Sequence, residues 1–546
     1  MNYKKLSIIA MTVCIVTAVV YLPALDNSFV NWDDPDYVYN NLEIKKSGID
    51  RIAWAFSSFS NGNWHPLTWI SLSIDYALWD LNPYGFHLSN ILFHSLNTLI
   101  VILLAGMLFR NATGKLDSSV YYAAFLVGLF FGIHPLHVES VVWISERKDV
   151  LYAFFFLLSI LFYIHYLSST ADRKKAMYYI LCLSFFLFSL LSKPMAVTLP
   201  AVLLILDFYP FKRIGCEKSS LRTIILEKTP FFLFSLASSV VTIIAQNRGG
   251  SMEANYYISL WERLLGAMKA IVLYLLKTIW PVNLVPLYPL SLDISPLRWD
   301  YFGSMLCLLC LSIVVIKLWK RTPVLIAAWT YYLVSLLPVL GIIQVGSQAM
   351  ADRYMYLPVL GPFIVLGALG AKMWHINNKA RYVSLIVTFL LAIIMSLLTV
   401  KQISVWQNSV TLWEYVVSNT SDSHKAYFNL GNAYKTKGDF ENAERAWKKT
   451  VEIAPDHSYA LNQLGNIYIM SNSLAEAKKY FLASIMADNK NAEAHYNLAY
   501  VLERLNELNE AHKHYEIFIE IAPPQYAHLF PAIKKKLSAI KAQGRN

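Results

Sequence analysis

The feature that most constrains this chain is the alternation of long apolar runs with short polar loops over residues 1–400. A helix needs about 20 consecutive apolar residues to cross the hydrocarbon core of a bilayer, where no water can satisfy an irregular backbone. Only 15% of the residues are charged, against about 25% in typical soluble domains. The sequence therefore predicts a polytopic integral membrane protein.

The apolar runs predict a helical membrane domain with about eleven spans within residues 1–400. The predicted spans are residues 6–22, 88–109, 120–133, 150–167, 176–192, 195–210, 229–245, 301–318, 322–342, 355–372 and 381–399. Residues 261–280 are also apolar, but they contain four charged side chains. We interpret them as an interfacial or re-entrant helix whose Lys and Arg side chains reach the headgroup level.

Lys and Arg concentrate in alternate loops between these runs. The basic stretches are Arg110–Lys115, Arg173–Lys175, Lys212–Lys228, Lys317–Arg321 and Lys372–Arg381. Because short loops rich in Lys and Arg remain in the cytoplasm, this pattern predicts a cytoplasmic N-terminus and an extracytoplasmic C-terminal region. It also explains much of the net charge of +11, so no nucleic-acid partner is expected.

The composition changes near residue 400, after which the sequence resembles that of soluble helices and contains a 34-residue repeat. The repeated positions are small residues (Gly431, Gly465 and Ala499), alanines (Ala443, Ala477 and Ala511) and aromatics (Trp447, Phe481 and Tyr515). This spacing is typical of tetratricopeptide repeats. We predict a linker over 401–423, three repeats over 424–523, and a capping helix and tail over 524–546.

The predicted extracytoplasmic loops contain the polar motifs that chemistry requires. The first loop contains WDDPDY (residues 32–37) and WHPL (residues 64–67). Two adjacent carboxylates, Asp33 and Asp34, beside a membrane span suggest a general base or a divalent-ion site near a lipid headgroup. The alternative is a solvated turn, since Asp and Pro favour turns.

The second loop is HPLHVES (residues 134–140), followed by Glu146, Arg147, Lys148 and Asp149. His134 and His137 are candidates for metal ligands, although neutral histidines at helix ends are commoner. Arg147 and Lys148 have the chemistry to hold a phosphate; the alternative is that both reach from a span end toward the headgroups.

Two further loops place charges on the same predicted face. Lys193 lies in the turn SKP, and Asp352, Arg353 and Tyr354 lie in ADRYMYLP (residues 351–358). Carboxylates in one loop and cations in the others fit an active site for an anionic lipid substrate.

The order of these motifs resembles the family of transmembrane and tetratricopeptide repeat-containing proteins, which are glycosyltransferases of type C. The resemblance rests on WDDPDY, WHPL, HPLHVESVVWISERKDVLY (residues 134–152), SKP, ADRYMYLP and the repeats, and it covers essentially the whole chain. It implies a polytopic enzyme with an extracytoplasmic active site that uses a polyprenyl-phosphate sugar. Eukaryotic members of this family are O-mannosyltransferases acting on proteins.

For this chain the resemblance implies that Asp33 and Asp34 are the acidic catalytic motif and that Glu139 belongs to the same site. The residues predicted to bind the substrate are Trp32, His65, His137, Glu146, Arg147, Lys148, Lys193, Asp352, Arg353 and Tyr354. Three repeats are fewer than eukaryotic members carry, so the form resembles a bacterial or archaeal cell-membrane protein. The sugar, the acceptor (protein or glycan) and the need for a divalent cation stay open.

Two functional hypotheses follow. The first is an inverting membrane glycosyltransferase in which Asp33 or Asp34 is the general base, and Pro35 favours Asp34 because it fixes the backbone directly after it. The second is a non-enzymatic scaffold whose repeats recruit envelope proteins. A scaffold needs one membrane span, whereas this chain has many and gathers polar loops on one face.

Overall fold

The computed structural model describes residues 3–214, 220–249, 258–290, 293–343, 346, 348–420 and 422–543. Within these residues the chain is helical apart from one antiparallel pair of short strands, β1 (Tyr288–Pro289) and β2 (Gln348–Met350). The chain divides into two compact units, Met1–Leu412 and Trp413–Asn546. The predicted all-α class is confirmed.

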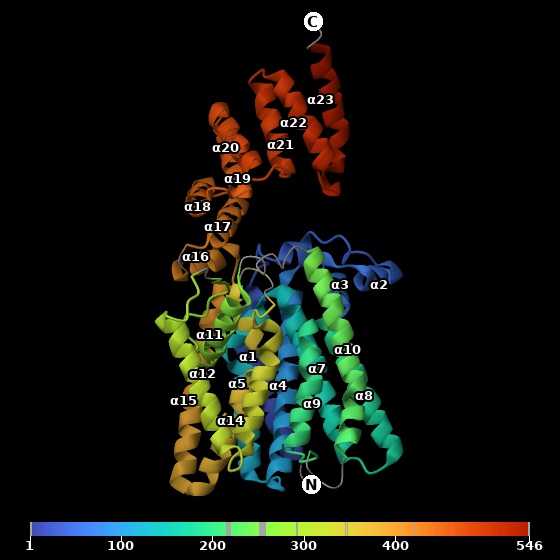
Figure 1. The fold of residues 1–546 in the computed structure, drawn as a ribbon, viewed down its shortest axis with the longest axis vertical. Helices are drawn as coiled ribbons and strands as arrows, with labels where there is room; N and C mark the ends of the chain where they lie inside the picture. Colours follow the sequence, from blue (N-terminus) through green and yellow to red (C-terminus); the bar gives the residue numbers. More distant parts are fainter. Residues whose placement is uncertain are drawn as a thin grey trace. The chain divides into compact units, whose positions relative to one another are not determined.

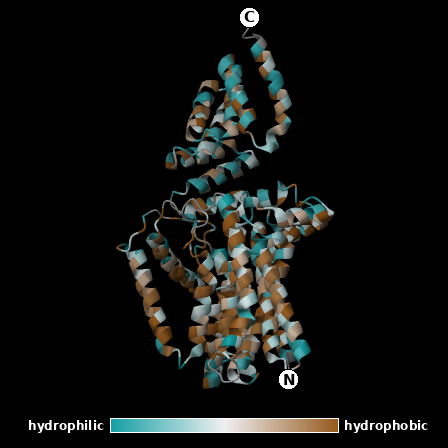
Figure 2. Cartoon of the chain, turned by 45° about the vertical axis from the view of Figure 1, so that its right-hand side comes forward, coloured by the Kyte–Doolittle hydropathy of each residue, from teal (hydrophilic) through white to brown (hydrophobic). Residues whose placement is uncertain are grey.

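The first unit, here called the membrane unit, is a bundle of long apolar helices (Figures 1 and 2). Seven helical segments among the described residues are long and apolar enough to cross a membrane: Lys4–Asp26, Pro83–Thr113, Ile144–Ser168, Asp172–Ser192, Leu221–Arg248, Trp299–Leu318 and Asn378–Val405. They correspond to α1 (Tyr3–Tyr21), α4 (Pro83–Thr113), α7 (Arg147–Ser168), α8 (Asp172–Ser192), α10 (Leu221–Arg248), α12 (Trp299–Leu318) and α15 (Asn378–Val405). In the bundle, α4 packs against α1 and α7.

The other four predicted spans are helical but differ from straight crossings. Helix α5 (Ser118–Ile133) continues through a bend of 50° into the segment Pro135–Val142. The remaining three are shorter apolar helices: α9 (Leu199–Phe208), α13 (Pro323–Leu336) and α14 (Leu360–Ile376). Proline accounts for part of the difference, since Pro194 and Pro338 lie in 3-10 turns that adjoin α9 and α13.

Helix α11 (Leu260–Ile279) coincides with the segment predicted to be interfacial or re-entrant, and it is not among the candidate spans. Its charged side chains bond to neighbouring groups: Arg263 donates to the carbonyl of Ile342, and Lys269 lies 2.6 Å from Asp300. Arg263 and Lys269 are therefore paired with groups of the protein although they lie on a largely apolar helix.

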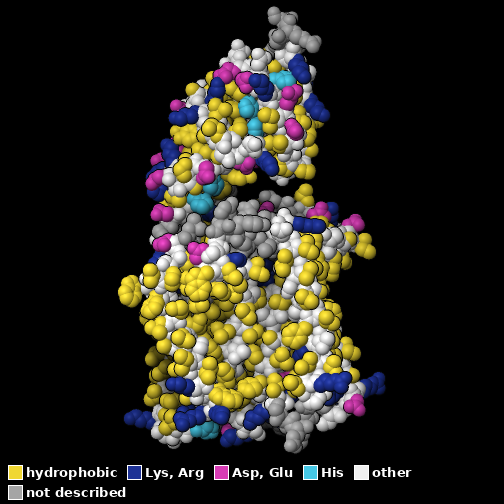
Figure 3. All heavy atoms as spheres, viewed as in Figure 1, with side chains coloured by type: hydrophobic (Ala, Val, Ile, Leu, Met, Phe, Trp, Pro, Cys, Tyr) yellow, Lys and Arg dark blue, Asp and Glu magenta, His cyan; other side chains and the backbone are white. Residues whose placement is uncertain are grey.

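At one end of the bundle lie the short elements that carry the polar motifs. They are the 3-10 helices η1 (Leu22–Asp26), η3 (Ser60–Gly62), η4 (Pro135–His137), η5 (Ile144–Glu146), η6 (Pro194–Thr198), η8 (Leu337–Val339) and η9 (Asp352–Met355), the π-helix η2 (Pro35–Tyr39), and the α-helices α2 (Gly48–Ser57), α3 (Pro66–Trp79) and α6 (Val138–Val142). Lys and Arg gather at the opposite end, near the N-terminus (Figure 3). The two ends of the membrane unit therefore differ in charge as the sequence predicted.

A buried cluster fixes the first loop, residues 23–87, onto the bundle. Tyr37, Val38, Ala55, Trp69 and Phe86 are almost fully buried and pack together with Ile144 from the second loop. Packing of this density leaves few alternative side-chain positions, so the two loops hold one another in place.

The second unit, here called the repeat unit, is a stack of antiparallel helix pairs. Its helices are α17 (His424–Lys437), α18 (Phe440–Ile453), α19 (Ser458–Met470), α20 (Leu474–Ala487), α21 (Ala492–Arg504), α22 (Leu508–Ile521), η10 (Pro524–Leu529) and α23 (Phe530–Gln543). The residues predicted as a linker, 401–423, contain the end of α15 and helix α16 (Ser409–Asn419).

The repeated small and aromatic positions meet within each helix pair. A Cβ atom placed on Gly431 would lie 2.4 Å from the Trp447 ring, and one on Gly465 would lie 2.5 Å from the Phe481 ring. Trp447, Phe481 and Tyr515 are fully or almost fully buried. Glycine at these positions is therefore required by the close approach of an aromatic ring, as the repeat pattern predicted.

Candidate functional site

A cavity of about 680 Å³ lies at the loop-bearing end of the membrane unit. It is bounded by the first loop, the start of α7, the turn around Lys193, helix α10, and the segment before η9. Its charged lining residues are Asp33, Glu146, Lys148, Lys193 and Arg353. All five are among the site residues predicted from the sequence. The fold brings them together from four separate segments of the chain.

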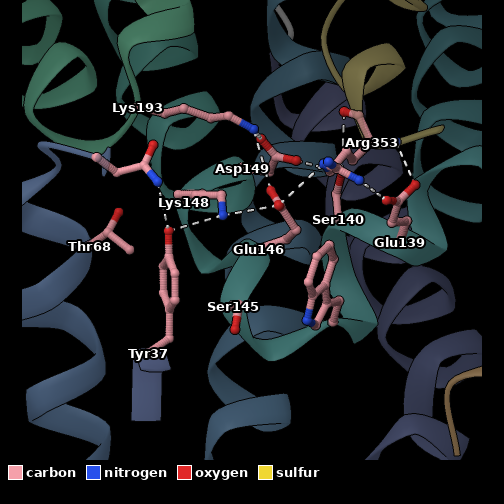
Figure 4. Close-up of polar contacts among 12 residues, drawn as sticks. Tyr37, Thr68, Glu139, Ser140, Ser145, Glu146, Lys148, Asp149, Lys193 and Arg353 are labelled. Carbon is pink, nitrogen blue, oxygen red and sulfur yellow. Dashed lines mark hydrogen bonds and ion pairs between the residues drawn. The ribbon is translucent and has the colours of Figure 1, made fainter. Parts of the chain in front are cut away.

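The carboxylate of Glu146 is the meeting point of the three cations (Figure 4). Lys148 Nζ lies 3.1 Å from Glu146 Oε1, and Arg353 Nε lies 3.3 Å from the same oxygen. Lys193 Nζ lies 3.3 Å from Oε2. Three cations that converge on one carboxylate have the charge and the N–H donors that a phosphate also requires.

Two further carboxylates, those of Asp149 and Glu139, form ion pairs with Lys193 and Arg353. Lys193 also pairs with Asp149 Oδ1, whose other oxygen accepts a 2.9 Å hydrogen bond from Ser140. Arg353 pairs with Glu139 through its guanidinium, and its backbone N–H donates to Glu139 Oε2 at 3.0 Å. Glu139, predicted to belong to the same site as Asp33 and Asp34, does not line the cavity; its carboxylate is bonded to Arg353.

Aromatic rings complete the wall behind the cations. Trp32 stacks on Trp143 at 4.5 Å between ring centroids, and both line the cavity. The Arg353 guanidinium lies 5.4 Å from the centre of the Trp143 ring and 5.0 Å from that of Tyr354, which also lines the cavity. Cation–π contacts of this kind favour the charged form of the guanidinium and fix its plane.

Asp33 and Asp34 are neighbours in sequence but have different environments. Asp33 lines the cavity, and burial raises the pKa of its carboxyl, while the nearby Lys148 ammonium opposes that rise. A carboxylate that is less acidic than usual and faces the cavity has the properties of a general base.

Asp34 is buried and bonded to the protein. Its Oδ2 accepts a hydrogen bond from the backbone N–H of Val30 at 2.9 Å, and Oδ1 accepts from the N–H of Ser145 at 3.1 Å and from its hydroxyl at 2.5 Å. Burial nevertheless raises the pKa of Asp34 to about 6. Asp34 does not line the cavity; it ties the first loop to the second.

Arg147 occupies a position apart from the cavity, although it lies directly before Lys148. Its side chain is completely buried, forms a 2.5 Å ion pair with Asp75, and donates to Asn90, Ser71 and the carbonyl of Phe86. Consecutive residues at the start of a helix point about 100° apart, so one cation faces the cavity and the other faces α3 and α4. Arg147 is not among the residues that line the cavity, and its predicted contact with the substrate stays a prediction.

The histidines divide in the same way. His65 lines the cavity, and burial together with the nearby Lys148 keeps its pKa well below the usual value, so the ring is neutral. His137 is buried in an aromatic cluster, where its Nδ1 bonds to the carbonyl of Phe131 at 2.7 Å, and His134 bonds to the carbonyl of Thr278. Among the described residues, no group of three or more His, Cys, Asp or Glu side chains is arranged to hold a metal ion.

Asp352 lies behind the cavity wall. Its Oδ1 accepts a 3.0 Å hydrogen bond from the Tyr288 hydroxyl. Burial raises the pKa of Asp352 to about 8, and the neighbouring Glu139 contributes to the rise. A neutral carboxyl at this position links η9 to β1 and supports Arg353, the next residue.

Sequence reasoning missed the uncharged polar residues of the cavity. They are Gln348, Asn61, Asn63, Ser239, Thr242 and Gln246. The last three have a detectable signal, because a spacing of three and four residues places Ser239, Thr242 and Gln246 on one face of the apolar helix α10. Asn61 and Asn63 have no such signal in the sequence, since polar residues are common in loops.

The fold and this site define a class: a polytopic helical membrane protein with a charged cavity at one end of its membrane unit and a separate repeat unit. The family model for the tetratricopeptide repeat matches residues 424–457, and a second model of that repeat matches 458–491 and 492–525. The presence of tetratricopeptide repeats in residues 424–525 is thus confirmed.

Comparison of the whole chain identifies its relatives. It is 24% identical over 445 residues to the protein O-mannosyl-transferase F38B6.6 of Caenorhabditis elegans, covering 79% of this chain and 60% of that protein. It is 23% identical over 470 residues to the human protein O-mannosyl-transferase TMTC1, covering 77% and 52%. The chain is homologous to these transmembrane and tetratricopeptide repeat-containing proteins, and it spans about half to three fifths of their length.

Among solved structures, a crystal structure of ArnT from Cupriavidus metallidurans bound to undecaprenyl phosphate aligns with 93% of this chain and 79% of that chain. The sequence identity is 13% and the TM-score is 0.37. At that level of similarity the two folds are not equated.

Proposed function

We propose that this protein is a membrane glycosyltransferase that moves a sugar from a polyprenyl-phosphate donor to a hydroxyl of a protein or glycan acceptor. The observation that carries the proposal is the convergence of Lys148, Lys193 and Arg353 on one side of a cavity that also contains the carboxylate of Asp33. Homology to protein O-mannosyl-transferases supports the same reaction class.

The three cations suit the phosphate of the donor. Each forms an ion pair with Glu146, so the three cations already face one oxyanion and need little reorganisation to bind a phosphate beside it. When the sugar departs, its phosphate gains negative charge, and fixed cations in a site of restricted water stabilise that charge more strongly than water does.

Asp33 is proposed as the general base. As the acceptor oxygen attacks the anomeric carbon, the bond from that carbon to the phosphate oxygen breaks, and the electron pair leaves with the polyprenyl phosphate. The acceptor proton passes to Asp33 and then to solvent. A single displacement from the face opposite the phosphate inverts the anomeric configuration.

The side of the membrane follows from charge. Lys and Arg gather at the end of the membrane unit away from the cavity, which by the positive-inside rule is the cytoplasmic end (Figure 3). On this proposal the site faces the extracytoplasmic space of a cell membrane, and the same charge rule applied to the sequence predicts an extracytoplasmic C-terminal region. Fusing alkaline phosphatase after Lys401 is expected to give activity, whereas a cytoplasmic fluorescent reporter at that point is expected to stay dark.

The reaction itself is tested with purified full-length protein in lipid nanodiscs. We expect release of polyprenyl phosphate and transfer of the sugar when a panel of polyprenyl-phosphate sugars is supplied with peptide or glycan acceptors. Adding and removing EDTA in the same assay shows whether a divalent cation contributes. A protein that neither binds nor turns over any member of the panel would contradict the proposal and favour the scaffold hypothesis.

A further inference from the structure

The charges that line the cavity nearly cancel, which is more than the binding of a phosphate requires. The cations are Lys148, Lys193 and Arg353, the carboxylates are those of Asp33 and Glu146, and the His65 ring is neutral. With three cations and two carboxylates ionised, the lining has one net positive charge. Because a carboxylate that contacts all three cations weakens their attraction for any other anion, the position of Glu146 affects which anions the site can hold.

Glu146 differs from the two other carboxylates that pair with these cations. Asp149 pairs with Lys193, and it does not line the cavity. Glu139 pairs with Arg353, and it also lies outside the lining. Glu146 lines the cavity and lies 3.1 to 3.3 Å from all three cations (Figure 4). Lys193 and Arg353 therefore keep a carboxylate partner even if the charge of Glu146 is removed.

Lys148 also has contacts other than Glu146. Its Nζ atom lies 3.4 Å from the Tyr37 hydroxyl and 4.7 Å from the centre of the Tyr37 ring. It lies 5.9 Å from the centre of the Trp143 ring. Contacts with aromatic faces hold an ammonium in place without neutralising it. Glu146 is thus not the sole support of any of the three cations.

The charged groups around Glu146 are shielded from water. Glu146 is 1% exposed, and Lys148 is 9% exposed. Buried charges are screened by salt much less than exposed ones, and their interaction energy scales with the product of the two charges. The carboxylate of Glu146 therefore penalises a bound anion in proportion to the negative charge of that anion.

The proposed reaction changes the charge of the lipid. The donor is a phosphodiester, and its phosphate carries one negative charge. The polyprenyl phosphate that departs is a monoester, which carries about 1.5 to 2 negative charges at neutral pH because its second pKa is about 6. One negative charge balances the net charge of the cavity lining, and two negative charges exceed it.

We propose that Glu146 is the residue by which the site distinguishes its donor from its product. Its charge disfavours the phosphomonoester more strongly than the phosphodiester, and this difference promotes the release of polyprenyl phosphate after sugar transfer. The inference rests on the proposed function, since a reaction that converts a phosphodiester into a phosphomonoester is what changes the charge of the bound lipid.

The test compares two lipids that differ in phosphate charge and carry no sugar. Polyprenyl phosphate and its methyl ester, a phosphodiester, are titrated into nanodiscs that contain full-length wild type, Glu146→Gln or the control Glu43→Gln. The titrations are done at about pH 8, well above the second phosphate pKa of about 6. Glu43 pairs with Lys46 in the first loop and does not line the cavity, so the control should change neither affinity.

In Glu146→Gln both lipids are expected to bind more tightly than in wild type. The methyl ester should gain about 10-fold in affinity and the monoester about 100-fold, because the repulsion that is removed scales with the charge of the ligand. Polyprenyl phosphate should become a correspondingly stronger inhibitor of sugar transfer. A purely structural role of Glu146 predicts the opposite sign, a loss of affinity for both lipids.

A second variant reverses the change in charge if Glu146→Gln disturbs the fold. Gln348→Glu adds a carboxylate to the cavity lining beside Tyr354, whose ring lies 5.0 Å from the Arg353 guanidinium. It is expected to weaken binding of the monoester more than binding of the methyl ester. Equal changes for the two lipids in either variant, or weaker binding of both by folded Glu146→Gln, would overturn the role of Glu146 and leave the proposed function standing. Failure of both wild type and Glu146→Gln to bind either lipid would overturn both.

Discussion

The two units of this protein bury opposite kinds of side chain. In the repeat unit the buried positions are small residues and aromatics that interlock, such as Gly431 with Trp447 and Gly465 with Phe481. In the membrane unit the most consequential buried positions are charged, with Glu146, Arg147 and Asp149 at 1% exposure or less. One unit minimises empty volume, and the other holds charges where water is scarce.

The difference shows how strongly each unit depends on distant parts of the chain. The glycine–aromatic pairs of the repeat unit are 16 residues apart and recur every 34 residues, so each pair forms within one repeat. The bond from the Arg353 backbone N–H to Glu139 joins residues 214 apart in sequence. The packing of the repeat unit therefore depends on residues within one repeat, whereas the geometry of the site depends on the placement of whole, distant segments of the chain.

The largest expected effect comes from Asp33→Asn. The change keeps the size of the side chain and removes the proposed base, so turnover should fall by about 10²- to 10⁴-fold while the melting temperature stays close to that of wild type. Since burial raises the pKa of Asp33, wild-type activity should increase with pH through a value above that of an exposed Asp. The loss of turnover in the variant and the pH dependence of the wild type are both measured as turnover of a polyprenyl-phosphate sugar at several pH values. An unchanged rate in the variant would show that Asp33 is not the base.

Asp34→Asn is the matched control for Asp33. Because Asp34 accepts three hydrogen bonds from Val30 and Ser145 and does not line the cavity, its loss should lower the melting temperature and leave turnover per folded molecule nearly intact. Loss of turnover in a fully folded Asp34 variant would mean that the two carboxylates have exchanged roles.

Arg147→Met tests the buried ion pair next to the site. Removing the guanidinium leaves Asp75 buried without its partner, and the expected loss of stability is roughly 3–5 kcal/mol. The same change at the exposed Arg173 should have little effect. Thermal unfolding of both variants in detergent measures the difference, and reduced donor affinity in the folded Arg147 variant would return this residue to the substrate site.

The pH dependence of stability provides a fourth test, at Asp34. Its pKa is about 6 in the folded protein against 3.8 for a free Asp, so the folded state binds the proton more tightly. The stabilising contribution of the protonated carboxyl is full below about pH 4 and is lost as the pH rises through 6, a change of about 3 kcal/mol. Melting temperatures of wild type relative to Asp34→Asn between pH 4 and 7 should show this decline; a constant difference would contradict the raised pKa.

The smallest effect is expected in the repeat unit. Gly465→Ala places a methyl group against the Phe481 ring and should cost about 1–3 kcal/mol through overpacking, with partial rescue by Phe481→Leu. Gly266→Ala in α11, where no atom lies within 4 Å of the new methyl group, is the matched control. Donor binding by the membrane unit should be unchanged, and coupled loss of donor binding would show that the two units act together.

Much of the fold was predictable from the sequence because its signals are periodic. Apolar runs long enough to span a bilayer predicted the helices, and small and aromatic residues at intervals of 34 predicted the helix pairs of the repeats. The lengths of α9, α13 and α14 were less predictable, since short apolar helices and full spans share the same composition.

The site was predictable as a set of motifs but not as a geometry. Polar residues beside apolar spans identified Asp33, Glu146, Lys148, Lys193 and Arg353, all of which line the cavity. The same reasoning could not separate Lys148 from Arg147 or Asp33 from Asp34, because adjacent residues share a motif and only the rotation of the backbone decides which side chain faces the cavity.

What the sequence by itself determined is the division into a helical membrane unit and a repeat unit, together with the loops that carry charge. Hydropathy and repeat period are properties of the local sequence, so both can be determined without knowledge of the fold. Only the tertiary structure decided which charges meet at Glu146, that Asp34 is bonded to Ser145, and that Gln246 donates to Asn63. These contacts join segments far apart in the chain, and their geometry is set by the packing of helices between them.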